Sequence, residues 1–484
     1  MKIKTMPLTY EEVLALPKPK RPKPKRPGFL FRSLVRILSA GDLKKVHFSY
    51  RSIGMERLKK GEPCLILMNH SSFIDLKIAS RVFYPRPLSI VCTSDGFVGK
   101  QWLMRSLGCI PTAKFVTDYA LVRDMVYAVR QLKSSILMFP EASYSFDGTA
   151  TPLPESVGKC LKLLNVPVVM VRTYGAFLRD PLYNNLQLRD VPVSAEVEYL
   201  LSPDEIMEKS PAQLSAVLKE RFTFDNFRWQ QEHALKVTEP FRADHLNRVL
   251  YKCPHCLQEG EMEGKGVTIT CKRCGQTYEL TEDGTLRAVS GEARFSHVPD
   301  WYRWERECVH KELEDGSYQL DVAVDIGVLR DTKAVYLVGE GRLTHDTEGF
   351  RLVGCDGKLD YRQKPAASYS LYSDFYWYEI GDVICIGKPD MLYYCFPKNC
   401  GDIVAKTRLA AEELYKMTNR QKVRVENRVR SITNAPSLHR LYQSPIKMCN
   451  AHFNCDTVIG TRRIFAMLTL SSRKCNAGTA LKTD

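Results

Sequence analysis

A histidine and an aspartate five residues apart, His70 and Asp75, stand in the segment "NHSSFID" directly after the apolar run "CLILM". A neutral imidazole is well suited to take a proton from a hydroxyl near pH 7, and a carboxylate can fix its tautomer and stabilise its charged form. On an uninterrupted helix, five residues correspond to a rotation of about 140°, which places the two side chains on different faces. The pair can therefore act together only if the chain turns between residues 70 and 75.

The same segment has a purely structural interpretation. Ser72 and Asp75 fit the Ser-x-x-Asp signal that begins many helices. In that case Asp75 caps a helix and His70 is an ordinary loop residue. A histidine and an aspartate at this spacing occur by chance in many chains, so the segment alone leaves both interpretations open.

Three later segments, in order, favour the chemical interpretation. The block "NHSSFID" resembles the Asn-His-x4-Asp block of the glycerolipid acyltransferases related to bacterial lysophosphatidate acyltransferase. "LGCIPTAK" at 107–114, "FPEASYS" at 139–145 and "VPVVMV" at 166–171 are similar to the next three blocks of that family. The resemblance covers roughly residues 45 to 215. It implies that His70 is the general base, that Asp75 orients it, and that the acyl donor is a thioester of coenzyme A or acyl carrier protein.

The resemblance also implies which residues bind the acceptor: Lys114, Glu141, Ser143 and Tyr144 occupy those positions. In the family a base of the second block and the Glu and Arg of the third hold the acceptor's polar head, commonly a phosphate. Here Tyr144 replaces that arginine, and Ala142 and Ser143 replace Gly and Thr. A lysine is a point charge and a tyrosine is a neutral hydroxyl, so the bidentate fork for phosphate is missing. The implied activity is acyl transfer to a lysophospholipid or glycerolipid hydroxyl, 1-acylglycerol-3-phosphate-like, with the headgroup left open.

The elements that must position these residues follow from the apolar pattern. Short apolar runs alternate with helix-like stretches between residues 45 and 220. The runs lie at 65–68, 88–92, 136–139 and 166–171, and the clearest helical stretches at 119–132 and 156–164. This alternation predicts an α/β domain, a sheet flanked by helices, over residues 45–245, and the resemblance implies that it is the acyltransferase domain. Reactive groups are then expected on loops at the ends of the strands.

Two Cys-x-x-Cys pairs, "CPHC" and "CKRC", are separated by fourteen residues and supply Cys253, Cys256, Cys271 and Cys274. Four thiolates at this spacing can surround zinc tetrahedrally, which predicts a zinc ribbon over residues 250–282. The ligand set leaves no position for water, so we expect a structural rather than a catalytic metal. His255 is expected to point away from the site.

The ends of the chain differ from its centre. Residues 1–44 are expected to form a basic, proline-rich arm and an amphipathic anchor helix after Gly28, which resembles an interfacial membrane anchor; a solvated linker with a helix docked on its own domain is the alternative. Residues 295–417 are predicted to be β-rich, possibly of pleckstrin-homology type, with a closing helix at 403–417 and with the aromatic segment 369–382 in its core. Residues 418–484 are basic and are predicted to be poorly structured.

The formal net charge of +15 implies attraction to anions, and no run approaches the length of about 18 apolar residues that a spanning helix needs. The cysteines show no disulfide framework and the N-terminus no signal, so a cytoplasmic, peripheral protein on the cytoplasmic membrane face is expected. The expected partners are the acyl donor, a lysolipid acceptor and the membrane surface, whereas nucleic acid is not expected. The alternative function is a zinc-ribbon adaptor that binds nucleic acid or lipid and carries an inactive acyltransferase scaffold.

Overall fold

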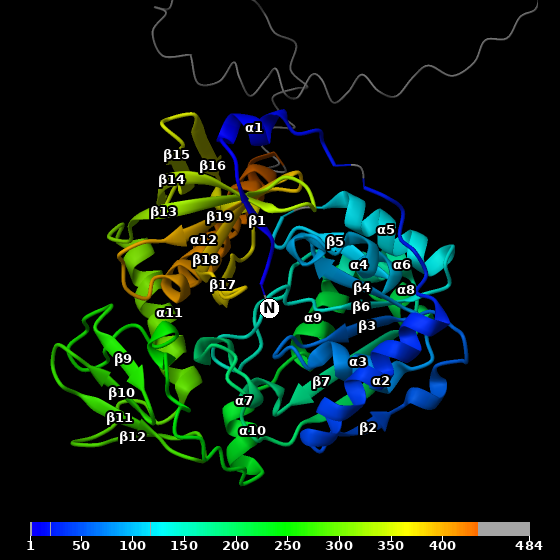
Figure 1. Ribbon diagram of the computed structural model, residues 1–484, viewed down its shortest axis with the longest axis horizontal. Coiled ribbons are helices and arrows are strands. Elements are labelled where there is room, and N and C mark those ends of the chain that lie inside the picture. The colour runs from blue at the N-terminus through cyan, green and yellow to red at the C-terminus, as the bar shows by residue number, and fades with distance from the viewer. Residues whose placement is uncertain (1, 20, 117, 434–484) are drawn as a thin grey trace, which may run out of the picture. The chain divides into compact units, whose positions relative to one another are not determined.

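The computed structural model describes residues 2–19, 21–116 and 118–433. Within them the strands form a seven-stranded, a four-stranded and an eight-stranded sheet (Figure 1). The helices that flank the first sheet make it a mixed α/β fold, as predicted. All three sheets lie in the compact unit Met1–Lys422. Residues 434–484, most of the predicted basic tail, lie outside the described residues.

The seven-stranded sheet carries the resemblance to acyltransferases. Its order is β2-β8-β7-β3-β6-β4-β5, and β4, β5 and β6 run parallel to β3, as does β7. The strands are β2 (Ser49–Ile53), β3 (Leu65–Met68), β4 (Leu88–Thr93), β5 (Cys109–Thr112), β6 (Ser135–Met138), β7 (Val168–Tyr174) and β8 (Ser194–Leu201). Each predicted apolar run is a strand, because a strand buried on both faces needs apolar side chains at every position.

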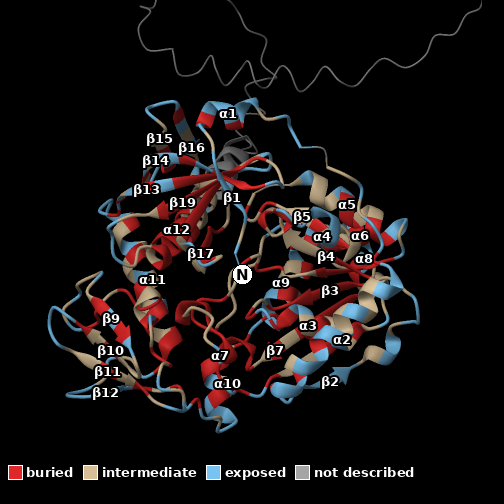
Figure 2. Cartoon of the chain, viewed as in Figure 1, coloured by how far each residue is buried: buried red, intermediate tan, exposed pale blue. Residues whose placement is uncertain are grey.

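Helices cover both faces of this sheet. Along β3, Leu65 and Leu67 pack into one core while Ile66 and Met68 pack into the other, as strand alternation requires. The first core is closed by α5 (Tyr119–Arg130), α6 (Val157–Leu164), α8 (Pro203–Glu208) and α9 (Pro211–Arg221), and the second by α2 (Phe29–Lys45) and α3 (Asp75–Phe83). Figure 2 shows β3 buried between these layers. The reactive loops are thereby held at the carboxyl edge of a rigid sheet.

The four-stranded sheet is the ribbon that carries the cysteines. Its order is β12-β11-β10-β9, with β9 (Met262–Lys265), β10 (Thr268–Cys271), β11 (Thr277–Leu280) and β12 (Leu286–Ala288). The helix α11 (Val298–Glu314) follows it and packs against it: the Trp301 indole donates a hydrogen bond to the carbonyl oxygen of Lys252 at 3.0 Å, and the Tyr278 ring lies 5.1 Å from that of Trp301. The ribbon therefore shares its core with the rest of the unit.

The third sheet is two antiparallel meanders joined through their first and last strands, in the order β16-β15-β14-β13-β19-β18-β17. Its strands are β13 (Leu320–Leu329), β14 (Val335–Asp346), β15 (Gly349–Gly354), β16 (Leu359–Gln363), β17 (Tyr372–Trp377), β18 (Gly381–Lys388) and β19 (Met391–Pro397), and α12 (Val404–Thr433) follows them. The predicted succession of strands and a closing helix is confirmed. The pleckstrin-homology type stays a prediction.

Three parts of the fold were not expected from the sequence. The strand β1 (Thr5–Pro7) pairs in parallel with β14, and α1 (Tyr10–Ala15) buries Tyr10 and Val13 in the β-rich core, so this part of the predicted arm belongs to the third sheet. The helix α11 was overlooked within the strand-rich region. Finally, α12 continues to Thr433, beyond the predicted end at residue 417, so residues 418–433 are helical where no structure was expected.

Within the described part of the chain, no helix combines the length and the apolar character that a membrane crossing requires.

Candidate functional site

The loop after β3 is fastened to the neighbouring strand by Asn69. Its Oδ1 accepts hydrogen bonds from the backbone N–H of Thr173 at 2.7 Å and from the Thr173 hydroxyl at 3.0 Å. Its Nδ2 donates to the Thr173 carbonyl and to the Ser71 hydroxyl, both at 3.1 Å. Asn69 is fully buried, so this network fixes where the chain leaves the sheet immediately before His70.

The chain turns between His70 and Asp75, and the two side chains meet. His70 Nδ1 lies 3.1 Å from Asp75 Oδ2. The same oxygen accepts the backbone N–H groups of Ser71 at 2.8 Å and Ser72 at 3.1 Å. Three donors on one buried oxygen hold the carboxylate in a fixed place, and they make Nδ1 the protonated nitrogen of the neutral ring. The Nε2 lone pair is then available to a hydroxyl.

The helix-capping interpretation of this segment is wrong in one respect. The helix α3 begins at Asp75 with Ile74 as its N-cap, not Ser72. The Ser72 hydroxyl instead donates a hydrogen bond to Asp180 and accepts one from the N–H of Ile74. Asp75 still accepts the N–H of Ser72, so one carboxylate both orders the start of the helix and orients the imidazole.

The imidazole of His70 lies between two aromatic rings. The Phe139 ring stacks on it at 4.2 Å between centroids and the Tyr144 ring at 4.0 Å. Burial lowers the pKa of His70 below its usual 6.5, against the opposing effect of Asp75. The ring is therefore neutral near pH 7, as a general base must be, and 17% of the side chain remains exposed.

Glu141, predicted to bind substrate, is engaged by the protein itself. Its carboxylate is fully buried and accepts the backbone N–H of His70 at 2.9 Å, the N–H of Thr151 at 2.8 Å and the Thr151 hydroxyl at 3.1 Å. Burial raises the pKa of Glu141 to about 7, against these hydrogen bonds. This geometry favours a role in positioning the His70 loop, and direct contact with substrate stays a prediction.

Ser143 and Tyr144 form a strained turn after Glu141. Ala142, where the related family has glycine, adopts a left-handed backbone with φ of 55°. The buried Ser143 hydroxyl donates to the carbonyl oxygen of Tyr144 at 3.1 Å, and that oxygen also accepts Nη1 of Arg408 at 3.2 Å. Arg408 belongs to α12, so the C-terminal helix holds the turn that places the Tyr144 ring on His70.

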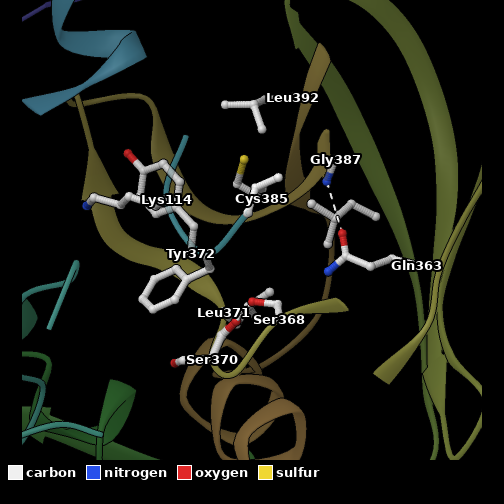
Figure 3. A pocket seen from close by; sticks show the side chains of 12 residues that line it. Lys114, Gln363, Ser368, Ser370, Leu371, Tyr372, Cys385, Gly387 and Leu392 are labelled. Atoms are coloured by element: carbon white, nitrogen blue, oxygen red, sulfur yellow. Dashed lines mark hydrogen bonds between the residues drawn. The ribbon is translucent and has the colours of Figure 1, made fainter. Parts of the chain in front are cut away.

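Lys114, at the end of the second block, faces the third sheet. Its ammonium lies 4.2 Å from the centre of the Tyr372 ring of β17. Both residues line a small hollow of about 10 Å³, room for about one water (Figure 3). The electrostatic field of Lys114 also acts to lower the pKa of His70. The structure thus brings the second-block lysine close to the candidate base and against the β-rich sheet.

The four cysteine sulfurs lie within 4.8 Å of one another, and two of the pairs, Cys253 with Cys274 and Cys256 with Cys271, are 3.7 Å apart. A tetrahedron of thiolates at about 2.3 Å from zinc has its sulfurs about 3.8 Å apart, so these residues fit a bound metal ion. His255 is exposed, as expected.

Sequence reasoning missed three residues of this region. Asn69 could have been identified from the sequence, because it directly precedes His70 in the first block. Asp180 carries no such signal, although it accepts the Ser72 hydroxyl and pairs with Arg179 at 2.9 Å; burial raises its pKa to about 6. Arg408 is 264 positions from Tyr144, and no local pattern links the two.

A comparison with protein families matches the part of the chain that carries the candidate site. Residues 49–173 match the model of the acyltransferase family. A solved structure, the 1-acyl-sn-glycerophosphate acyltransferase PlsC from Thermotoga maritima, is similar to 40% of this chain over 76% of its own, with 16% identity and a TM-score of 0.32. The family match covers β2 to β7 and includes His70, Asp75, Lys114, Glu141 and Tyr144. By this family match, residues 49–173, which carry these side chains, are an acyltransferase domain.

Proposed function

We propose that this protein transfers a fatty acyl group from an acyl thioester to a hydroxyl of a lysophospholipid or related glycerolipid, with His70 as the general base. The observation that carries the proposal is the 3.1 Å contact between His70 Nδ1 and Asp75 Oδ2 inside the stretch that matches the acyltransferase family. The donor is an acyl group on coenzyme A or acyl carrier protein.

The proposed reaction is a direct transfer in which His70 acts as base and then as acid. His70 Nε2 takes the proton of the acceptor hydroxyl while its oxygen attacks the thioester carbonyl carbon. The imidazolium that forms is stabilised by the Asp75 carboxylate. As the tetrahedral intermediate collapses, the carbon–sulfur bond breaks, the new ester bond remains, and the imidazolium returns its proton to the leaving thiolate. No residue is acylated, and the ring regains its neutral form.

Contact with the lipid surface is proposed through α2. Its apolar side chains Phe29, Leu30, Leu34, Ile37 and Leu38 are exposed, and Trp102 of α4 (Gln101–Ser106) is 71% exposed beside it, with the Phe31 ring at 5.9 Å. An exposed apolar helix face next to basic residues is typical of helices that lie in the membrane interface. We propose that this face rests on the cytoplasmic surface of a membrane, where lysolipids lie.

Part of the basic arm has a different role. Arg21 pairs with Asp118 and with Asp124, each at 2.8 Å, and donates to the Pro111 carbonyl at 2.7 Å. The arm is therefore anchored along α5 at Arg21, and the α2 face supplies the apolar contact.

We propose that the four cysteines hold a structural zinc ion. Zinc supplies a rigid cross-link between the two knuckles and no reactive position, because all four ligands come from the protein. Lys252, beside the first knuckle, pairs with Glu259 at 3.0 Å and Glu312 at 3.3 Å, and Lys406 of α12 pairs with Glu259 at 2.7 Å. Through these pairs the ribbon supports α11 and α12, and Arg408 lies two residues beyond Lys406.

The test is to incubate the purified protein with a mixed lysolipid extract and labelled acyl-CoA and to identify the product by mass. A new diacyl lipid that is absent with His70→Ala supports the proposal. If the parent forms no acylated product with any acceptor or with acyl carrier protein as the donor carrier, the domain is an inactive scaffold. Association with anionic vesicles without turnover then indicates a lipid-binding adaptor. The 1-acylglycerol-3-phosphate-like acceptor expected from the resemblance stays a prediction.

A further inference from the structure

The edge strand β17 of the third sheet lies against the acyltransferase loops. The Tyr372 hydroxyl donates to Asp95 Oδ2 at 2.6 Å, and the Trp377 indole donates to the same oxygen at 3.2 Å. Asp95 belongs to the 3₁₀ turn Ser94–Phe97 that follows β4. The aromatic segment expected to be a core is thus also a buried contact surface, and it closes the side of the site where Lys114 lies.

Asp374 lies on the same strand two residues after Tyr372, so the two side chains share a face of β17. Asp374 is 6% exposed, and its buried Oδ1 has no hydrogen-bond partner among the residues that the structure describes. The Tyr372 ring, on the same face, contacts the ammonium of Lys114. A buried carboxylate oxygen without a partner is costly, and its presence points to a donor that arrives with a ligand.

The charges around Asp374 support this interpretation. Burial raises the pKa of Asp374 to about 6, Lys114 and Arg408 act to lower it, and Asp95 acts to raise it. The carboxylate is therefore mainly ionised at pH 7. Arg408 is already paired with Glu412 at 3.3 Å, and Asp95 already accepts two side-chain donors. Among these four charged groups of the described residues, Lys114 is the cation and Asp374 the anion left for an acceptor headgroup.

This pair does not suit a phosphate monoester. Such a headgroup carries up to two negative charges, which favour a guanidinium fork, whereas this site has Tyr144 in place of the arginine and adds a carboxylate beside the lysine. Tyr144 lies near enough to both Asp75 and Asp374 for each carboxylate to act to raise its pKa, after burial, the larger cause. His70 stacks on the Tyr144 ring at 4.0 Å, and the electrostatic field of Asp374 acts on the same side chain.

We propose that Asp374 is a specificity-determining residue that accepts a hydrogen bond from a primary ammonium, and that the preferred acceptor is a zwitterionic, ethanolamine-type lysophospholipid. Lys114 then faces the single negative charge of the phosphodiester. This inference rests on the proposed function and narrows its acceptor. A quaternary ammonium has no N–H to donate, so a choline headgroup lacks the bond that Asp374 accepts.

The experiment measures kcat/KM with acyl-CoA and three acceptors that share one acyl chain: lysophosphatidylethanolamine, lysophosphatidylcholine and lysophosphatidate. The parent is expected to prefer the ethanolamine lipid over each of the others by about tenfold or more, the effect of one hydrogen bond to a charged group. In Asp374→Asn that preference should collapse through a higher KM for the ethanolamine lipid. Asp374→Glu should retain part of it. Asp356→Asn, which removes an exposed carboxylate from a turn of the same sheet, should change nothing.

Two results overturn the inference: a parent that prefers lysophosphatidate or uses the choline lipid equally well, or an Asp374→Asn variant that loses all acceptors alike. If Asp374→Asn does not fold, judged by its melting temperature, the comparison of the parent with Asp374→Glu decides the question. These failures leave acyl transfer itself intact. Failure of the proposed function is recognised separately, because a folded parent then acylates none of the three.

Discussion

Replacing Asp75 with asparagine tests the link between the imidazole and its carboxylate. The amide of asparagine has nearly the shape of the carboxylate. Its oxygen is expected to take the position of Asp75 Oδ2, where it accepts the N–H groups of Ser71 and Ser72, because the amide nitrogen is itself a donor and would be repelled by them. His70 Nδ1 can still donate to that oxygen, so the tautomer and the fold are expected to survive. What Asp75→Asn removes is the negative charge that stabilises the imidazolium.

The size of the effect follows from the geometry. With Nδ1 and Oδ2 3.1 Å apart, the two charge centres are about 4 Å apart, and at an effective dielectric constant of about 20 their attraction is about 4 kcal/mol. Since about 1.4 kcal/mol corresponds to a factor of ten in rate, the expected loss in kcat/KM is about 10³-fold.

The assay is kcat/KM for acyl transfer as a function of pH, with the melting temperature of each variant as the control for folding. The base must be neutral, so the rate falls as the pH drops through the pKa of His70, which lies below 6.5. Asp75 raises that pKa, so without its charge the acid limb should move to lower pH. A loss of less than tenfold, or an acid limb that moves to higher pH, would refute the reasoning.

Three further changes test other parts of the structure. Ala142→Gly relieves the left-handed backbone and should raise the free energy of unfolding in denaturant by up to about 1 kcal/mol, whereas Ala150→Gly should not; an unchanged or lower value contradicts the strained turn. Cys274→Ser should reduce the zinc content, measured by metal analysis, from about one ion per chain to none, and it should lower the melting temperature. The substitution of the exposed Cys400 by serine should change neither quantity. Full zinc content in Cys274→Ser would exclude this site. Ile37→Glu should weaken binding to anionic vesicles about tenfold or more in a sedimentation assay at unchanged melting temperature, and unchanged binding would show that α2 does not rest on the lipid.

The sequence predicted four strands of the central sheet, β3, β4, β6 and β7, because each contains a continuous apolar run, whereas the exposed β2 gives no such signal. A short continuous apolar run between turn residues, such as Leu65–Met68, is typical of a strand that is buried on both faces. The two clearest predicted helices begin and end within a few residues of their predicted bounds. The cysteine spacing was equally informative, since ligand geometry restricts it.

The elements that were missed depend on contacts distant in the sequence. The strand β1 is short and exposed, and only its pairing with β14 makes it a strand. The buried side of α11 includes Glu305, whose carboxylate accepts the N–H of Lys252, and this charge interrupts the apolar pattern of the helix. Likewise, the contact of Lys114 with Tyr372 joins two sheets, and no local pattern could predict it.

The chemistry was predicted only in part. The turn that brings His70 to Asp75 could be expected from a strand followed by a polar segment. The aromatic rings on both sides of the imidazole and the three donors that engage Glu141 follow from the packing of the loops, and they could not be read from the spacing of residues.

The central claim is that the His70 imidazole takes the proton of the acceptor hydroxyl. It is tested most directly by the single-turnover rate of acyl transfer in the parent and in His70→Gln, with donor binding measured separately for both. We expect donor binding and melting temperature to be retained while the rate falls by at least about 10³-fold. A folded His70→Gln protein that transfers the acyl group at the parental rate would contradict the account.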